Sequence, residues 1–180
     1  MKLAVLKERH EGETRVAATP DTVKKLTGLG FEVVIETGAG LGSSFMDGAY
    51  EEAGAKIVAS ADEALDNADL IFKIRRPTDD ELGKIKKGAK VIASLNPYQD
   101  AEGIKAYADA GVEAYAMELM PRITRAQSMD ILSSQSNLSG YKSVLVAANE
   151  YGRGFPMMMT AAGTVAPARV MVFGAGVAGL

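Results

Sequence analysis

The chain contains no cysteine, no tryptophan and a single histidine, His10, among its 180 residues. Without cysteine it can form neither a disulfide nor a thiolate metal site, and one histidine cannot build a histidine-rich metal centre. No stretch reaches the roughly 18 consecutive apolar residues of a membrane-spanning helix, and Lys7 interrupts the apolar N-terminus. We therefore expect no metal site and no direct membrane span.

An excess of charge of one sign is also lacking. The 20 basic and 23 acidic residues are mixed along the chain and give a net charge of -3. This balance offers no basic field for nucleic acid and no polybasic patch for a membrane surface. With 47% apolar residues, the length suits one buried core plus a portion of another. We expect a soluble, globular, cytoplasmic protein.

Short apolar runs alternate with helical patterns through the first 116 residues. Such alternation predicts right-handed βαβ units, a doubly wound, mostly parallel sheet with helices on both faces, and therefore an α/β fold of the Rossmann-like or flavodoxin-like type. We assign residues 1–130 to this N-terminal domain. The expected strands are Lys2 to Leu6, Glu32 to Glu36, Lys56 to Ala59, Leu70 to Ile74, Lys90 to Ser94 and Val112 to Ala116.

Helix boundaries have local signals. Thr19 followed by Pro20 and Asp21 predicts a helix start, with the threonine as N-cap. The proline-free stretch from Leu132 to Tyr151 predicts one long connecting helix, and residues 131–168 form this helix and a connector. The methionines at 157–159 fit a cofactor pocket wall or, more commonly, packing between domains. The glycines at 38–42 invite a phosphate-binding interpretation but lack the spacing of the dinucleotide fingerprint.

The most polar stretch runs from Pro121 to Asn137 and reads P-R-I-T-R-A-Q-S-M-D-I-L-S-S-Q-S-N. It follows an apolar segment, 112–120, so we place it at the carboxyl end of the sheet, where open α/β sheets bind ligands. One interpretation is a polar clamp on a ligand with hydroxyl, amide and phosphate groups. The other is a loop that caps the next helix through Ser128 or Asp130.

The C-terminal residues 169–180 resemble the start of a second, truncated Rossmann domain. Arg169 to Phe173 has strand composition and runs directly into G-A-G-V-A-G. Glycines in G-x-G-x-x-G spacing after a strand allow a tight turn and close approach of backbone N–H groups to a pyrophosphate. The acidic residue expected about 20 positions later, which would bind a ribose, is not among these 180 residues.

Four motifs together resemble one family. They are K-E-R-x-x-x-E-T-R-V-A-A-T-P near the start, the loop P-R-I-T-R-A-Q-S-M-D-I-L-S-S-Q-S-N-L-S-G-Y, the connector F-P-M-M-M-T-A-A-G-T-V-x-P-A-R-V, and the terminal V-F-G-A-G-V-A-G-L. The resemblance is to the NAD(H)-binding domain in the α subunit of proton-translocating NAD(P) transhydrogenases, and it covers all 180 residues.

This resemblance implies two α/β halves with NAD(H) between them and direct hydride transfer to NADP+ on a partner domain. Gln127 and Asp130 are the implied catalytic residues, with Gln127 positioning the nicotinamide. It also implies a homodimer that works with NADP(H)-binding and membrane-spanning components at the inner face of a membrane. The implied cofactor contacts are Arg122, Ile123, Thr124, Gln127, Ser128, Met129, Asp130, Ser133, Gly174, Gly176, Val177, Ala178 and Gly179.

Two alternatives remain. A more distant resemblance to alanine dehydrogenase implies that Arg15 and Lys73 hold a substrate carboxylate, but Asn96 stands where that enzyme has a catalytic histidine. An amide cannot act as a general acid or base near neutral pH, and His10 lies among charges in the first loop. Because the chain holds only the beginning of the second half, a non-catalytic α/β binding or oligomerisation module is the other alternative.

Overall fold

A computed structural model describes all residues, 1–180, and the chain divides into two compact units, Met1–Met120 and Pro121–Leu180. Each unit is described by itself. The domain boundary that we placed at residue 130 stays a prediction.

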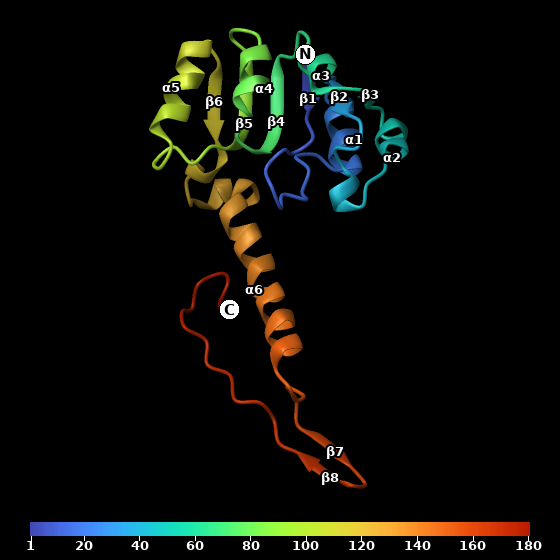
Figure 1. Cartoon of the computed structure of the whole chain (residues 1–180), viewed down its shortest axis with the longest axis vertical. Coiled ribbons are helices and arrows are strands. Elements are labelled where there is room, and N and C mark those ends of the chain that lie inside the picture. The colour runs from blue at the N-terminus through green and yellow to red at the C-terminus, as the bar shows by residue number, and fades with distance from the viewer. The chain divides into compact units, whose positions relative to one another are not determined.

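The first unit is built on a six-stranded sheet in which every neighbouring pair of strands is parallel (Figure 1). The strand order is β3-β2-β1-β4-β5-β6. This confirms the predicted α/β fold and all six predicted strands, with bounds that differ by at most one residue. The strands are β1 (Lys2–Val5), β2 (Glu32–Glu36), β3 (Lys56–Val58), β4 (Leu70–Arg75), β5 (Lys90–Ser94) and β6 (Glu113–Ala116).

Helices cover both faces of this sheet. Successive side chains of a strand point to opposite faces, so Leu3 and Val5 join one core while Ala4 and Leu6 join the other. The first core is completed by α1 (Pro20–Gly28) and α2 (Asp47–Glu52). The second core contains side chains of the helices α3 (Ala61–Leu65), α4 (Asp79–Lys84) and α5 (Ala101–Ala110).

The sheet has a topological switch point between β1 and β4. The chain moves outward from β1 to β3 on one side, then returns to β4 and moves outward to β6 on the other. The loops that leave β1 and β4 therefore diverge, and such a crevice at the carboxyl ends of the strands is where doubly wound sheets bind ligands.

Side-chain caps fix the helix starts. Thr19 caps α1 as predicted, with Pro20 in the first turn and the Thr19 side chain accepting from the Thr22 N–H. Thr78 and Glu81 form a reciprocal capping box at α4. Three short 3-10 helices were not predicted: η1 (Leu41–Ser43), η2 (Met117–Leu119) and η3 (Thr124–Met129).

The glycines at 38–42 are explained by close packing. A Cβ at Gly40 would lie 2.6 Å from the Tyr50 ring, and one at Gly42 would lie 2.6 Å from the Thr14 carbonyl oxygen. Neither position has room for a side chain. This packing accounts for the two glycines without a bound phosphate.

The second unit contains the long helix α6 (Ile131–Glu150), as predicted from its composition. An antiparallel hairpin of β7 (Met158–Thr160) and β8 (Gly163–Val165) lies within the predicted connector and was missed. The strand predicted from Arg169 to Phe173 was wrong, because these residues form no regular structure. No strand of the chain pairs with them, and a strand needs a neighbour to satisfy its backbone groups. No helix of either unit combines the length and apolar content needed to cross a membrane.

Candidate functional site

The polar loop of the second unit presents most of its side chains to solvent. Its 3-10 helix η3 is anchored by one buried residue, Ala126, while the flanking side chains from Arg122 to Met129 are exposed. A short turn with one apolar anchor holds the backbone and leaves the polar groups available. Within this loop, the exposed residues among our predicted contacts are Arg122, Ile123, Thr124, Gln127, Ser128 and Met129.

Asp130 ends this loop and begins α6. Its Oδ1 accepts from the Ser133 N–H at 3.0 Å, and its Oδ2 accepts from the Ser133 hydroxyl at 2.6 Å. These hydrogen bonds from Ser133 lower the pKa of Asp130 below its usual range. The capping interpretation is confirmed for Asp130, whereas Ser128 lies inside η3 and does not cap α6. The structure thus brings two predicted contacts together, because Ser133 donates two hydrogen bonds to the Asp130 carboxylate.

The glycine motif forms a tight turn although its preceding strand is absent. Gly174 has φ +105°, a left-handed value that favours glycine, and the N–H groups of Gly179 and Leu180 donate to the Gly176 carbonyl at 3.0 and 3.1 Å. A Cβ at Gly179 would collide with the Gly174 carbonyl oxygen. The motif therefore closes on itself with no space for a larger residue at Gly179.

This turn lies against the middle of α6. A Cβ at Gly140 of that helix would lie 2.3 Å from the Ala178 carbonyl oxygen, so the contact requires a glycine there. Figure 1 shows the C-terminal segment returning beside α6. Asp130 caps the same helix at its N-terminus. No hydrogen bond or ion pair joins residues 122–133 to residues 174–180, so the structure connects the two predicted regions through α6 and not by direct polar contact.

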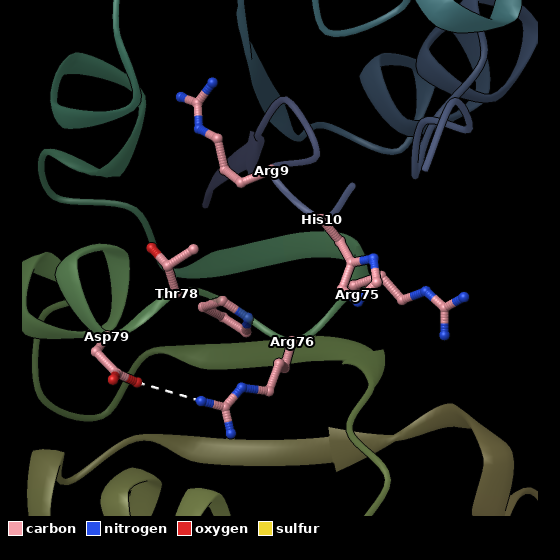
Figure 2. A pocket seen from close by; sticks show the side chains of 7 residues that line it. Arg9, His10, Arg75, Arg76, Thr78 and Asp79 are labelled. Atoms are coloured by element: carbon pink, nitrogen blue, oxygen red, sulfur yellow. Dashed lines mark hydrogen bonds and ion pairs between the residues drawn. The ribbon is translucent and has the colours of Figure 1, made fainter. Parts of the chain in front are cut away.

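The first unit carries a pocket of about 270 Å³ at the switch point (Figure 2). The loop after β1 contributes two of its lining residues, and the end of β4 with the start of α4 contributes the others. We did not single out this pocket from the sequence, although the dense charge directly after β1 and β4 was a usable signal. Its polar lining residues are Arg9, His10, Arg75, Arg76, Thr78 and Asp79.

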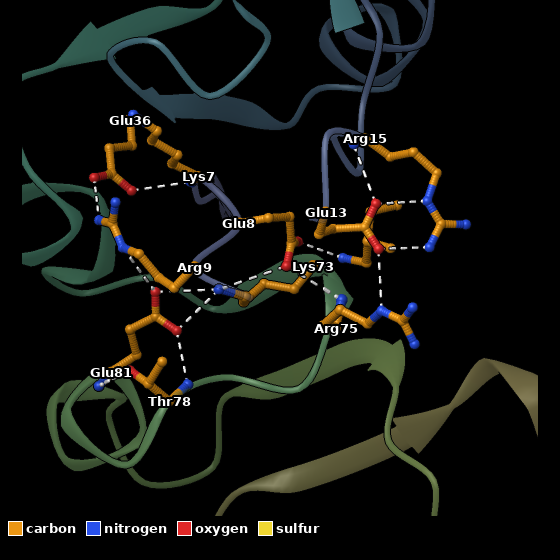
Figure 3. A network of polar contacts seen from close by, with 11 residues as sticks. Lys7, Glu8, Arg9, Glu13, Arg15, Glu36, Lys73, Arg75, Thr78 and Glu81 are labelled. Carbon is orange, nitrogen blue, oxygen red and sulfur yellow. Dashed lines mark hydrogen bonds and ion pairs between the residues drawn. The ribbon is translucent and has the colours of Figure 1, made fainter. Parts of the chain in front are cut away.

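A buried ionic network lies beside that pocket (Figure 3). The Lys73 side chain is only 1% exposed, and its Nζ donates to both carboxylate oxygens of Glu81 at 2.9 and 3.1 Å. It also lies 3.9 Å from Glu8, whose carboxylate accepts from the Ile74 N–H at 2.6 Å. Burial raises the pKa of Glu8, and the nearby Lys73 opposes that shift. One lysine thus compensates two buried carboxylates.

Glu13 forms a second cluster with two arginines. Its carboxylate accepts from Arg15 Nε at 2.7 Å and from Arg75 Nε at 3.0 Å. The hydrogen bond from the Arg15 side chain is the main reason why the pKa of Glu13 falls to about 2. Arg15 and Lys73, the positions that the alanine dehydrogenase resemblance assigns to a substrate carboxylate, are therefore each paired with a carboxylate of the chain itself.

Asn96 lies in the loop after β5 and adopts a left-handed conformation with φ +52°. Its backbone N–H donates to Glu118, and its side-chain amide donates to Gln99 Oε1 at 3.1 Å. Its side chain therefore supports the local turn. His10 is exposed, with Nδ1 3.0 Å from the Glu11 carbonyl oxygen. Neither residue has the buried partner that would orient a general acid or base.

Comparison with protein families matches both regions of the chain. Residues 4–139 match the family described as alanine dehydrogenase/PNT, N-terminal domain, and residues 143–180 match the corresponding C-terminal domain.

Individual relatives point the same way. The chain is 56% identical to an NAD(P) transhydrogenase subunit alpha polypeptide of Rhodospirillum rubrum, over 100% of its own length and 48% of that protein. The solved transhydrogenase of Sinorhizobium meliloti superimposes with a TM-score of 0.96 at 55% identity, covering 99% of this chain and 53% of that one. An alanine dehydrogenase of Halomonas elongata is 32% identical, over 99% of this chain and 48% of that protein. The chain spans about half the length of these relatives.

Proposed function

Because the chain belongs to the alanine dehydrogenase/PNT family, we propose that it is the NAD(H)-binding portion of an NAD(P) transhydrogenase α subunit. Within the whole protein, NADH supplies a hydride to NADP+ held by a partner domain, and membrane-spanning partners couple the transfer to proton translocation. One observation carries this proposal. The exposed polar loop, Arg122 to Ser133, leads into α6, and the glycine turn lies against that same helix.

The glycine turn fits a dinucleotide. Gly174 supplies the left-handed backbone, and Gly179 packs so closely on the Gly174 carbonyl oxygen that no Cβ fits there. Such a turn lets backbone N–H groups approach a pyrophosphate closely. The N–H groups of Val177 and Ala178 are the donors that we assign to this contact, together with the backbone at Gly174, Gly176 and Gly179.

The polar loop fits the nicotinamide end. Gln127 carries an exposed amide that both donates and accepts, which complements a carboxamide. Asp130 has spare acceptor capacity beyond the two hydrogen bonds from Ser133, so it can accept from a ribose hydroxyl or an amide N–H. Arg122 is exposed near Asp130 and organises the loop or contacts the cofactor. Ile123, Thr124, Ser128 and Met129 complete the contact surface.

Transfer between two nicotinamides requires placement of two carbons and no proton donor. The absence of an acid/base arrangement at Asn96 and the internal pairing of Arg15 and Lys73 support this reaction over amino-acid oxidation. The names of the relatives as subunits support association with further components. A homodimer at the inner face of a membrane belongs to the same proposal.

Titration of the 180-residue chain with NADH, followed by nicotinamide fluorescence, tests this proposal. We expect saturable binding that Gly179→Ala weakens by at least about tenfold, because the added Cβ opens the turn. Gly152→Ala is the matched control, since its Cβ position has no neighbour within 4 Å. Absence of binding, or equal binding by the Gly179→Ala variant, would favour the non-catalytic module instead.

A further inference from the structure

The pocket at the switch point is lined by cations on the outside and supported by carboxylates from within. The Arg9 side chain is 39% exposed, whereas its partner Glu36 is 7% exposed. Arg75 is about half exposed, whereas its partner Glu13 is nearly buried. Because each carboxylate lies deeper than its arginine, the acids position the guanidinium groups and the arginines form the accessible surface.

Several N–H donors at this pocket remain available. Arg75 uses Nε to reach Glu13, and no hydrogen bond of the chain engages its two terminal nitrogens. Arg9 uses Nε and Nη2 for Glu81 and Glu36, which leaves Nη1. His10 donates to the Glu11 carbonyl through Nδ1, so its Nε2 is a further donor when the imidazole ring is protonated. These donors come from two different loops.

Acceptors are scarce in the same lining. Asp79 supplies the only carboxylate there, and its Oδ1 already receives a hydrogen bond from Arg76 Nη2 at 3.3 Å. The Thr78 oxygen accepts from the Glu81 N–H. Figure 2 shows Arg9 and Arg76 on opposite sides, with His10 and Arg75 between them. A ligand rich in acceptors and poor in donors complements this lining.

We propose that this pocket binds a small phosphate-bearing anion. Guanidinium groups bind phosphate oxygens through paired N–H donors, and the pocket of about 270 Å³ has room for a phosphoryl group with a small organic substituent. Arg75 and His10 contact the phosphate oxygens directly, while Glu13 positions Arg75. All lining residues of the site belong to the first unit and none belongs to the loop at 122–133, so the inference does not rest on the proposed NAD(H) site.

Calorimetric titration of the 180-residue chain with inorganic phosphate tests this inference, at an ionic strength held constant with chloride. A parallel titration with glycerol 3-phosphate distinguishes free phosphate from a phosphate ester as the preferred ligand, according to which binds more tightly. We expect saturable binding to the wild type. Arg75→Gln and His10→Gln should each weaken it about tenfold through the loss of a charge-assisted hydrogen bond.

Lys105→Gln is the matched control, because it removes an exposed cation from α5 outside the pocket and should leave the affinity unchanged. His10→Gln keeps the experiment decisive if Arg75→Gln loses stability, since the exposed His10 ring bonds only to the neighbouring Glu11. The proposal is overturned if neither phosphate compound binds, or if the two pocket variants bind as tightly as the control.

Discussion

Replacing Gln127 by alanine in the full-length α subunit is expected to slow hydride transfer about 100-fold, while the Kd for NADH changes less than about threefold. The exposed amide of Gln127 sets the orientation of the nicotinamide, whereas the glycine turn and the rest of the loop supply most of the binding. A displacement of about 1 Å at the reacting carbon is enough for a loss of this size. Stopped-flow measurement of transfer and an NADH titration separate the two effects.

Asn149→Ala provides the control, because Asn149 is another exposed amide of the second unit, located near the far end of α6. Its transfer rate should equal that of the wild type. An unchanged transfer rate in the Gln127→Ala variant would remove the assigned positioning role, and equal losses in rate and affinity would make Gln127 a binding residue only.

Lys73→Met is expected to reduce the free energy of unfolding of the first unit by about 3–5 kcal/mol. The methionine fits the space of the lysine stem, but it leaves the buried Glu8 without its cation and the buried Glu81 with only the more distant Arg9 Nε at 3.7 Å. Since a domain of this kind is stable by about 5–15 kcal/mol, the loss is a large fraction of the total. Urea unfolding followed by circular dichroism measures it.

Lys84→Met is the comparison for that experiment. Lys84 also pairs with two carboxylates, Asp62 and Asp80, but all three side chains are substantially exposed. Exposed pairs contribute little because water screens them, so we expect a loss below about 1 kcal/mol. Equal losses of unfolding free energy in the two variants would mean that the buried Lys73 pairs stabilise the unit no more than the exposed Lys84 pairs.

The sheet was predictable from the sequence because burial on both faces produces apolar runs such as Leu3 to Leu6 and Val33 to Ile35. Capping chemistry likewise fixed the start of α1 at Thr19. The strand at 169–173 failed as a prediction because composition reports compatibility with a strand, whereas formation requires a neighbour that supplies hydrogen bonds. The hairpin β7–β8 was missed because its strands are three residues long and, unlike the equally short β3, do not alternate with helices.

The candidate site was predictable where its signal is local. The spacing of Gly174, Gly176 and Gly179 and the polarity of residues 121–137 lie in single stretches of sequence. The switch-point pocket instead joins residues such as His10 and Arg75, which are far apart in the chain and meet only because β1 and β4 are adjacent. The order of strands in the sheet, which the sequence pattern does not specify, decides which loops share a crevice.

The central claim is that the hydride passes directly from NADH to NADP+, and isotope transfer tests it most directly. NADH carrying deuterium at the transferred position of nicotinamide C4 is mixed with NADP+ and the full-length α subunit together with its partner components in ordinary water. Direct transfer predicts that the deuterium moves with its electron pair to C4 of NADP+ and is recovered there without dilution, because no titratable group takes part. NADPH carrying solvent hydrogen at that carbon would contradict the account.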